Sequence, residues 1–450
     1  MGTERRSETL DRKKMAKKTT INPSTSRAKQ KNSPSLTKAA TKRRYQHHRP
    51  IHQFMIYKLP FEILVDIFSR VSLHDISQSK LVCKELYNSL KPLFADRIFV
   101  NLHCSRIRLN SVMTNPNFLV FATTDRGEYT RFYIAHHGGI SLGTSLRASR
   151  IHLDSVNRYD NMEIVGSSNG LVCLYNSSTI LFHIFNPLTR ETLELPKTSE
   201  LGAFYESYSE NSQCGFAFDS ITNTYKIILA RRSNEVSGTG IAVYTLGSGM
   251  WRRLEHSVNC VLARKRPVLL NGGLHWLGYF WGEHLIWLYG IAVMDICTET
   301  FRKFKVPSKL LCWDYYKIAE ICLVRNCLSI ILEDYEYWVI WSLKNYFVED
   351  SWEKKTIVKR QLHGISGYNL SIIGALNNGS LLFRFDTSFY HNENRKFQKI
   401  TIHGVPPNSD TIDVLPFVGS LISPKTLDGQ TRKEHPIKES EEKQLFLLKD

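Results

Sequence analysis

Residues 271–276 read Asn-Gly-Gly-Leu-His-Trp, a tight turn that runs directly into apolar side chains. Asn-Gly supplies the left-handed backbone that a two-residue hairpin turn requires. The same pattern returns at intervals of about fifty residues, which predicts a repeated hairpin. The other copies are Ser168-Asn169-Gly170-Leu171-Val172, Phe218-Asp219-Ser220-Ile221-Thr222, Arg325-Asn326-Cys327-Leu328-Ser329 and Asn377-Asn378-Gly379-Ser380-Leu381.

A second pair of strands follows the hairpin in several repeats. In each case one strand leads into a polar turn, and the next strand begins with basic or aromatic residues. This pattern occurs in 185–196, 243–254 and 293–307. A lone four-stranded unit cannot cover both of its faces, so such units stack side by side in a closed ring. We therefore predict a β-propeller of about six blades over residues 115–422. Phe118-Leu119-Val120-Phe121 and Val414-Leu415-Pro416-Phe417-Val418 are expected to pair and close the ring.

Residues 55–100 have helical spacing instead. Ile63, Leu64, Ile67, Phe68 and Val71 fall at i, i+1, i+4, i+5 and i+8, which places them on one stripe of a helix. A second short helix is expected after an N-cap at Asp75, and a third over 83–94. The predicted fold class is therefore α+β and multidomain, with a small three-helix module before an all-β propeller.

The charge of the chain is concentrated in its first residues. Of the 450 residues, 59 are Lys or Arg and 42 are Asp or Glu, a net charge of +17. Residues 1–50 contain 15 of these bases and 3 acids, so this segment holds +12 and the remainder +5. Its composition predicts a disordered basic tail, and residues 423–450 are expected to form a second, charged flexible tail. The basic clusters at 13–18 and 42–44 are compatible with a nuclear import signal or with a solvated tail.

Motifs of catalysis, metal binding and membrane insertion are missing from the sequence. It contains no P-loop, Gly-x-Ser-x-Gly or His-Glu-x-x-His motif, and its 9 cysteines are scattered through apolar contexts. No run approaches the roughly 18 apolar residues of a membrane helix. We expect no catalytic residues, metal, cofactor or membrane partner. A propeller enzyme with its site in the central channel, and a nucleic-acid binder that uses the basic tail, remain as alternatives.

Two families resemble this chain. The helical module resembles the F-box in Leu59-Pro60, Glu62-Ile63-Leu64, Asp66-Ile67-Phe68, Arg70-Val71 and Leu81-Val82-Cys83-Lys84. Residues 115–422 are similar to the F-box-associated, kelch-like domain of plant F-box proteins in Asn169-Gly170-Leu171-Val172, Asn186-Pro187-Leu188-Thr189-Arg190 and Asn271-Gly272-Gly273-Leu274-His275-Trp276. The chain departs from the F-box pattern at Leu86, where the family has Trp, at Ser79 for a frequent Phe, and at Ser72 for a common Pro.

The resemblance implies a non-catalytic substrate receptor of a Skp-cullin-F-box ubiquitin ligase, acting in the nucleus, the cytoplasm or both. The F-box would bind a Skp-type adaptor, and through it the cullin and RING subunits, while the propeller would recruit an unknown protein target for ubiquitination. A helical bundle that only caps the propeller, and a stand-alone binding module in the nucleus, are the alternatives. The adaptor-binding residues implied are Leu59, Pro60, Ile63, Leu64, Ile67, Phe68, Val71, Leu81, Val82 and Leu86.

Target contacts are expected in the turns of the propeller, because variable loops on a rigid scaffold commonly carry recognition. Trp and Tyr side chains offer large contact areas at low entropic cost, so they make good anchors. Packing in the blade core is the alternative for these aromatic residues, and a solvated turn is the alternative for the arginine pair. The candidates are Arg231, Arg232, Trp281, Trp313 and Tyr315.

Overall fold

The computed structural model describes the chain between residues 56 and 434, with several gaps. The gaps are 95, 97, 101, 104, 107–116, 125–128, 137–144, 152–161, 202–211, 233–238, 256–257, 264–265, 282–286, 308–309, 311–317, 334–336, 359–369, 376–380, 386–387, 394–395, 407–408 and 410. The predicted disordered tail at 1–50 lies outside the described residues, as do residues 435–450.

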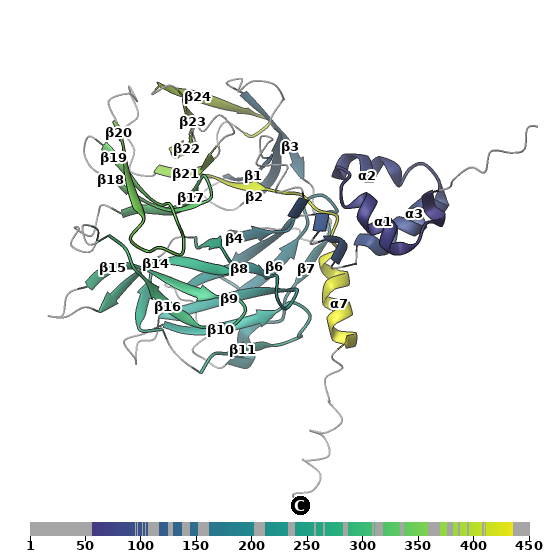
Figure 1. Cartoon of the computed structure of the whole chain (residues 1–450), viewed down its shortest axis with the longest axis horizontal. Coiled ribbons are helices and arrows are strands. Elements are labelled where there is room, and N and C mark those ends of the chain that lie inside the picture. The colour runs from purple at the N-terminus through teal and green to yellow at the C-terminus, as the bar shows by residue number, and fades with distance from the viewer. Residues whose placement is uncertain are drawn as a thin grey trace, which may run out of the picture. The chain divides into compact units, whose positions relative to one another are not determined.

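The helical module contains the three helices that the apolar spacing predicts. They are α1 (Phe61–Phe68), α2 (Leu73–Ser79) and α3 (Lys84–Leu90), with the 3₁₀ turns η1 (Ile56–Lys58) and η2 (Lys91–Phe94). The three helices are labelled in Figure 1. The apolar stripe of α1 buries Leu64, Val65 and Phe68, which form a small core with Ile76 of α2 and Leu90 of α3. Burial of this stripe, more than helix propensity, stabilises helices as short as these.

Helix α2 begins one turn earlier than the sequence indicates. Ser72 is its N-cap, and its hydroxyl accepts a hydrogen bond from the Asp75 backbone N–H at 3.2 Å. The Ser72 hydroxyl in turn donates to the Asp75 carboxylate at 2.7 Å. The prediction of Asp75 as the N-cap is therefore wrong, and Asp75 belongs to the first turn, where its charge suits the positive end of the helix. Ser72, which stands where the F-box pattern commonly has proline, therefore caps the N-terminus of α2.

The strands form antiparallel units, which we call blades 1 to 6. Blade 1 contains β25 (Thr411–Phe417), β1 (Asn117–Thr124), β2 (Tyr129–His136) and β3 (Ser145–Ile151); blade 2 contains β4 (Met162–Ser168), β5 (Leu171–Asn176), β6 (Leu181–Phe185) and β7 (Thr192–Glu194), followed by η3 (Thr198–Leu201); blade 3 contains β8 (Ser212–Asp219), β9 (Thr224–Arg232), β10 (Thr239–Thr245) and β11 (Trp251–Arg253).

The second half of the chain repeats this arrangement. Blade 4 contains β12 (Cys260–Leu262) and β13 (Val268–Leu270), which both pair with β14 (Gly273–Trp281), then β15 (Trp287–Asp295) and β16 (Phe301–Phe304); blade 5 contains β17 (Ile318–Val324), β18 (Cys327–Glu333), β19 (Tyr337–Leu343) and β20 (Trp352–Val358); blade 6 contains β21 (Leu370–Ala375), β22 (Leu381–Phe385), β23 (Ser388–Glu393) and β24 (Lys396–His403). A parallel contact between β24 and β3 joins blades 6 and 1 into one eight-stranded sheet. The count of about six propeller blades stays a prediction.

Blade 1 combines the two ends of the β-domain. β25 pairs with β1 in antiparallel register from Asn117 opposite Phe417 to Thr123 opposite Thr411. The predicted pairing of Phe118–Phe121 with the segment that begins at Val414 is confirmed. Pairing of the first and last strands removes two open sheet edges, which would otherwise invite aggregation.

Three of the predicted hairpin turns have the backbone that their sequences require, whereas after Phe218-Asp219-Ser220-Ile221-Thr222 the positive φ falls on Asn223, at 57°. Asn169 and Gly170 have φ angles of 49° and 78°, and Asn271 and Gly272 have φ angles of 49° and 75°. In Arg325-Asn326 two side-chain-bearing residues occupy the same left-handed region, at 52° and 59°. Two successive residues with positive φ produce the tight turn whose twist matches the flanking strands. The copy at 377–379 lies outside the described residues.

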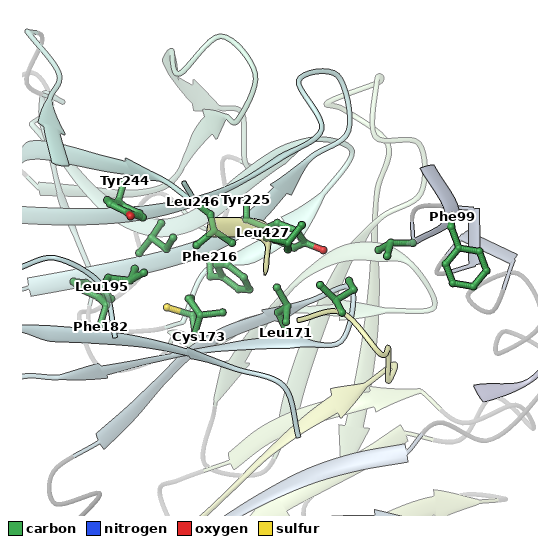
Figure 2. Close-up of a cluster of buried hydrophobic side chains, with 14 of the residues drawn as sticks. Phe99, Leu171, Cys173, Phe182, Leu195, Phe216, Tyr225, Tyr244, Leu246 and Leu427 are labelled. Atoms are coloured by element: carbon green, nitrogen blue, oxygen red, sulfur yellow. The ribbon is translucent and has the colours of Figure 1, made fainter. Parts of the chain in front are cut away.

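A continuous core packs blade 2 against blade 3. Cys173 and Phe182 of blade 2 meet Phe216, Tyr225 and Tyr244 of blade 3, as Figure 2 shows. The rings of Phe182 and Trp251 are 5.1 Å apart between the two blades. Such stacking of apolar blade faces is what a four-stranded unit needs in order to bury both of its surfaces.

The segment after residue 423 begins with a helix and not with a flexible tail. Helix α7 (Pro424–Glu434) places Leu427 in the core of blades 2 and 3, where Figure 2 labels it. The Tyr244 hydroxyl also donates to the Asp428 carboxylate at 3.3 Å. The prediction of a flexible tail from residue 423 is therefore wrong up to residue 434. A single well-placed leucine provides the anchor that the charged composition of the segment concealed.

Candidate protein-binding surfaces

The helical module separates the ten predicted adaptor-binding residues into three groups. Leu64, Phe68 and Leu86 are buried in the module core. Leu59, Ile67 and Val71 are half-buried and pack against that core. Pro60, Ile63, Leu81 and Val82 are exposed. Leu64, Phe68 and Leu86 therefore support the fold of the module, and the prediction that they offer surface to a partner is corrected by their burial.

The exposed group is unusually apolar for a protein surface. Leu81 is 78% exposed, Val82 is 73% exposed and Ile63 is 47% exposed. Leu81 and Val82 lie in the short connection between α2 and α3, where backbone hydrogen bonds to Gln78 and Ser79 hold them. Sequence reasoning missed further exposed members of the module, because helical spacing does not show which face a partner covers. They are Ile56, Phe61, Tyr87 and Ile98.

Polar contacts fix the end of α1 beside this surface. The Asp66 carboxylate accepts hydrogen bonds from Arg70 at 2.8 Å and from Arg106 at 3.1 Å. The hydrogen bond from Arg70, and then that from Arg106, lower the pKa of Asp66. A ring nitrogen of His103 lies 3.0 Å from the Val71 carbonyl. The module thus presents its apolar side chains on a framework held by hydrogen bonds.

The predicted target contacts at Arg231 and Arg232 do not form one exposed turn. Both residues belong to strand β9, where they pair with Gly240 and Thr239 of β10. Arg231 is 3% exposed, so the prediction of a target contact at this residue is wrong. Arg232 is exposed at the end of the strand. In an antiparallel strand successive side chains point to opposite faces, which explains why the pair is divided.

The aromatic candidates for target contact are located only in part. Trp281 is the last residue of β14 and lies opposite Trp287 of β15. Trp313 and Tyr315 lie outside the described residues. All three aromatic candidates therefore stay predictions. Trp281 lies at the end of β14 that is farther from the hairpin turn at 271–272.

A central cavity of about 420 Å³ passes between the blades. Strands from all six blades contribute to its wall, namely β4, β8, β13, β14, β17, β21, β22 and β25. The apolar part of the wall includes Val165, Phe216 and Ile321, and the charged part includes Arg266, Arg384 and Asp413. These three charged residues lie far apart along the chain and belong to no sequence motif. The sequence therefore gave no sign that they meet in one cavity.

Asp413 is the centre of the charged group in the cavity. Its carboxylate pairs with Arg266 and, at 3.0 Å, with Arg384. Arg384 also donates to the Ile412 carbonyl at 2.7 Å, and Arg266 donates to the Ile164 carbonyl at 3.2 Å. Burial acts to raise the pKa of Asp413, but the two guanidinium groups outweigh burial and lower it. The carboxylate therefore stays ionised, which suits a structural ion pair better than a proton donor.

The remaining polar groups that could suggest chemistry are packed or dispersed. His275 is fully buried, with ring nitrogens 3.0 Å from the Val268 carbonyl and 2.8 Å from the Tyr346 hydroxyl. Among the described residues no three His, Cys, Asp or Glu side chains gather closely enough to hold a metal ion. In the same part of the chain, no helix has the length and apolar character needed to cross a lipid bilayer.

Comparison with known proteins gives matches over both domains. A model of the F-box domain matches residues 56–93, and a model of the F-box associated beta propeller domain matches residues 118–421. F-box protein CPR1 of Arabidopsis thaliana is 24% identical over 332 residues, which cover 67% of this chain and 73% of the relative. F-box protein At3g07870 of the same plant is 22% identical over 398 residues, which cover 77% and 88%.

The beta-propeller domain of the Trilobed protease from Pyrococcus furiosus aligns with a TM-score of 0.34 and 9% identity, over 65% of this chain and 80% of that chain.

Proposed function

The chain belongs to the F-box proteins that carry an F-box associated β-propeller domain, and from this premise we propose that it is the substrate receptor of a Skp-cullin-F-box ubiquitin ligase. The F-box binds a Skp-type adaptor, which connects the chain to the cullin and RING subunits. The propeller recruits the protein target. Ubiquitin transfer is performed by the partner enzymes, and the receptor contributes proximity between target and ubiquitin.

The exposed apolar group of the helical module carries this proposal. Leu81, Val82 and Ile63 expose large apolar side chains on a module that is already folded around its own core. Complete removal of one such side chain from water contributes roughly 1.5–3 kcal/mol to the free energy of binding, before the entropic costs of association are subtracted. An apolar surface of this kind is typical of a site that a partner protein covers. The adaptor contact is therefore expected at Leu59, Pro60, Ile63, Leu81 and Val82.

The adaptor contact is tested by charge substitution at Leu81. We expect Leu81→Asp, alone and with Val82→Asp, to weaken binding of the purified full chain to a Skp-type adaptor more than tenfold, because an unpaired carboxylate would enter an apolar interface. Ile221→Asp is the matched control, since Ile221 is also 78% exposed but lies in the propeller. Isothermal titration calorimetry measures both affinities.

Two outcomes would contradict the proposal. One is an intact protein that does not bind the adaptor. The other is equal binding by the Leu81→Asp variant and the intact protein, provided that circular dichroism shows both to be folded. Leu86→Ala is expected to lower the thermal stability of the module instead, because Leu86 is buried.

The basic segment 1–50 is proposed to direct nuclear import and to be dispensable for adaptor binding. Its clusters at 13–18 and 42–44 support this assignment, because importins read such runs of Lys and Arg. A fluorescent fusion without residues 1–50 is expected to lose nuclear accumulation and to keep its affinity for the adaptor. Unchanged nuclear accumulation would remove the import role and leave a receptor that acts in the cytoplasm, the nucleus or both.

A further inference from the structure

One end of the propeller collects the hairpin turns of successive blades. Strand direction alternates within a blade, so the turn between its first and second strands lies at the same end as the turn between its third and fourth strands. Ion pairs connect these turns from blade to blade. Lys226 of blade 3 pairs with Glu299 of blade 4 at 2.9 Å, and Arg302 of blade 4 pairs with Glu349 of blade 5 at 3.0 Å. We call this end the turn face.

Over blade 2, the turn face already holds a non-helical segment of the chain. The side-chain amide of Asn186, in the β6–β7 turn, donates to the carbonyls of Ser420 at 2.9 Å and Ile422 at 2.7 Å. The Ser420 hydroxyl donates to the Asn169 carbonyl in the β4–β5 turn at 2.7 Å. The carbonyl of the same Asn186 side chain accepts from the Leu188 N–H at 2.8 Å. Turns of this face therefore bind a peptide segment through a side-chain amide that the turn itself orients.

Over blades 3 and 5, turns of the same kind present exposed apolar side chains. Asp219 accepts from the Ile221 N–H at 2.9 Å, and Asn345 accepts from the Phe347 N–H at 3.2 Å. The residue held in this way is largely exposed in both turns, with Ile221 at 78% and Phe347 at 85%. Met250 and Val348 add exposed apolar area at the same end.

The turn that carries Phe347 is held firmly in place. The Ser351 hydroxyl accepts from the Asn345 N–H and donates to the Asn345 carbonyl, both at 2.9 Å. Lys305 pairs with Asp350 at 2.6 Å and ties the turn to the end of β16. Phe347 is therefore an aromatic side chain on a fixed framework, which loses little entropy when a partner covers it. The Asn345 amide nitrogen has no acceptor among the described residues, whereas the corresponding group of Asn186 holds the Ser420 segment.

The charges around these turns leave a basic excess. Lys226, Arg302 and Lys305 pair with acidic groups of the turns, and Lys344 pairs with Glu353 at the start of β20. Asp295 is the one acidic side chain of these turns without a basic partner among the described residues, and it accepts from the Thr298 N–H instead. The outer strands that leave the turns carry exposed bases that pair with no described acid, namely Arg253, Lys303, Lys354 and Lys355. An acidic partner fits this distribution.

We propose that the turn face of blades 3 to 5 binds an acidic, extended segment of the target protein that carries large apolar side chains. The apolar side chains of the segment pack on Ile221 and Phe347, its acidic groups face the exposed bases of the outer strands, and its backbone carbonyls accept from Asn345. This inference rests on the proposed receptor function, because it assigns the target contact of the same propeller.

Selection from a display library of short random peptides tests the proposal with the full-length chain as bait. We expect the enriched peptides to combine Asp or Glu with large apolar residues. An enriched peptide, labelled with a fluorophore, is expected to bind the intact chain with an affinity that falls as salt is added. Ile221→Asp with Phe347→Asp is expected to weaken it more than tenfold, and Lys303→Glu with Lys354→Glu at least severalfold. Leu81→Asp is the matched control and is expected to leave peptide binding unchanged.

The proposal is overturned if no acidic and apolar peptide is enriched, or if the enriched peptides bind the Ile221→Asp, Phe347→Asp variant as well as the intact chain. A single-stranded oligonucleotide that binds more tightly than the peptides, and loses affinity only in the charge variants, would assign the face to nucleic acid. Peptide binding that appears only after removal of residues 435–450 would assign the face to the end of this chain. Either result would also overturn the proposal.

The receptor function and this inference fail in different measurements. Adaptor affinity is measured on the same preparations, and the Ile221→Asp, Phe347→Asp variant is expected to keep it. Loss of adaptor binding in the intact chain would refute the receptor function. Retained adaptor binding without peptide binding would refute only the assignment of the turn face.

Discussion

At the scale of single residues, His275 shows how a buried polar side chain joins two blades. It lies in β14 of blade 4, and one ring nitrogen donates to the Val268 carbonyl while the other accepts from the Tyr346 hydroxyl of blade 5. Both hydrogen bonds are satisfied by the neutral ring. Burial lowers the pKa of His275 from 6.5 to about 4, against the opposing effect of the Val268 hydrogen bond. The side chain therefore acts as an uncharged connector.

We expect His275 to make the stability of the protein depend on pH. The unfolded chain takes up a proton at this residue near pH 6.5, whereas the folded chain does so only near pH 4. The contribution of His275 to the free energy of unfolding is therefore fully present above pH 6.5. It is lost as the pH falls toward 4, and the loss is at most about 3 kcal/mol. His275→Gln removes this dependence. Thermal unfolding from pH 7.5 to 4 measures it, and parallel curves for the two proteins would contradict the assignment.

At the scale of elements, two hairpin turns with the same backbone differ in what surrounds them. Gly170 and Gly272 have φ angles of +78° and +75°, so both turns need glycine for the same conformational reason. A methyl group added at Gly170 would lie 2.3 Å from the Ser420 hydroxyl and 2.4 Å from its backbone nitrogen. The same group at Gly272 would meet nothing within 4 Å. Gly170 thus permits the C-terminal segment to lie on its turn.

The effect of the contact between Gly170 and Ser420 on stability can be measured by comparing the Gly170→Ala variant with the Gly272→Ala variant. Both substitutions introduce backbone strain of roughly 1–2 kcal/mol. Gly170→Ala is expected to cost about 1–3 kcal/mol more, because the added methyl group overlaps Ser420. It should also release helix α7, which follows this segment, to limited proteolysis. Equal melting temperatures and equal cleavage of α7 in the two variants would show that the contact does not stabilise the fold.

At the scale of the whole molecule, the last strand and the central cavity hold the ring together. β25 pairs with β1 and also carries Asp413 into the cavity, where it meets Arg266 of blade 4 and Arg384 of blade 6. One carboxylate therefore connects three blades. Such a contact is formed only when the ring is closed, because its members lie far apart along the chain.

Removal of the Asp413 charge is expected to destabilise the closed ring. Asp413→Asn leaves Arg266 and Arg384 without their carboxylate, and we expect a loss of about 1–3 kcal/mol, reduced by the partial exposure of the group. Asp350→Asn is the control, because its ion pair with Lys305 is exposed at the surface and contributes at most about 1 kcal/mol. Chemical unfolding measures both variants. Equal losses would mean that the cavity ion pairs contribute no more than a surface pair.

The sequence by itself determined the features that depend on neighbouring residues. Asn-Gly turns followed by apolar runs predicted the hairpins, since few residues other than Gly and Asn accept the left-handed backbone of those turns. The spacing of Ile63, Leu64 and Phe68 predicted a helix with one apolar stripe. The period of the repeats predicted blades, and the pairing of the first strand with the last followed from the need to close a ring.

Only the tertiary structure decided which of these side chains are available to partners. It buried Arg231, Leu64 and Leu86, left Leu81 exposed, and placed Leu427 of an apparently featureless segment in the core. It also brought Asp413 to its two arginines and set the turns of blades 3 to 5 on one face. The physical reason is that burial and ion pairing depend on contacts between residues distant along the chain, which ring closure creates and which no local spacing encodes.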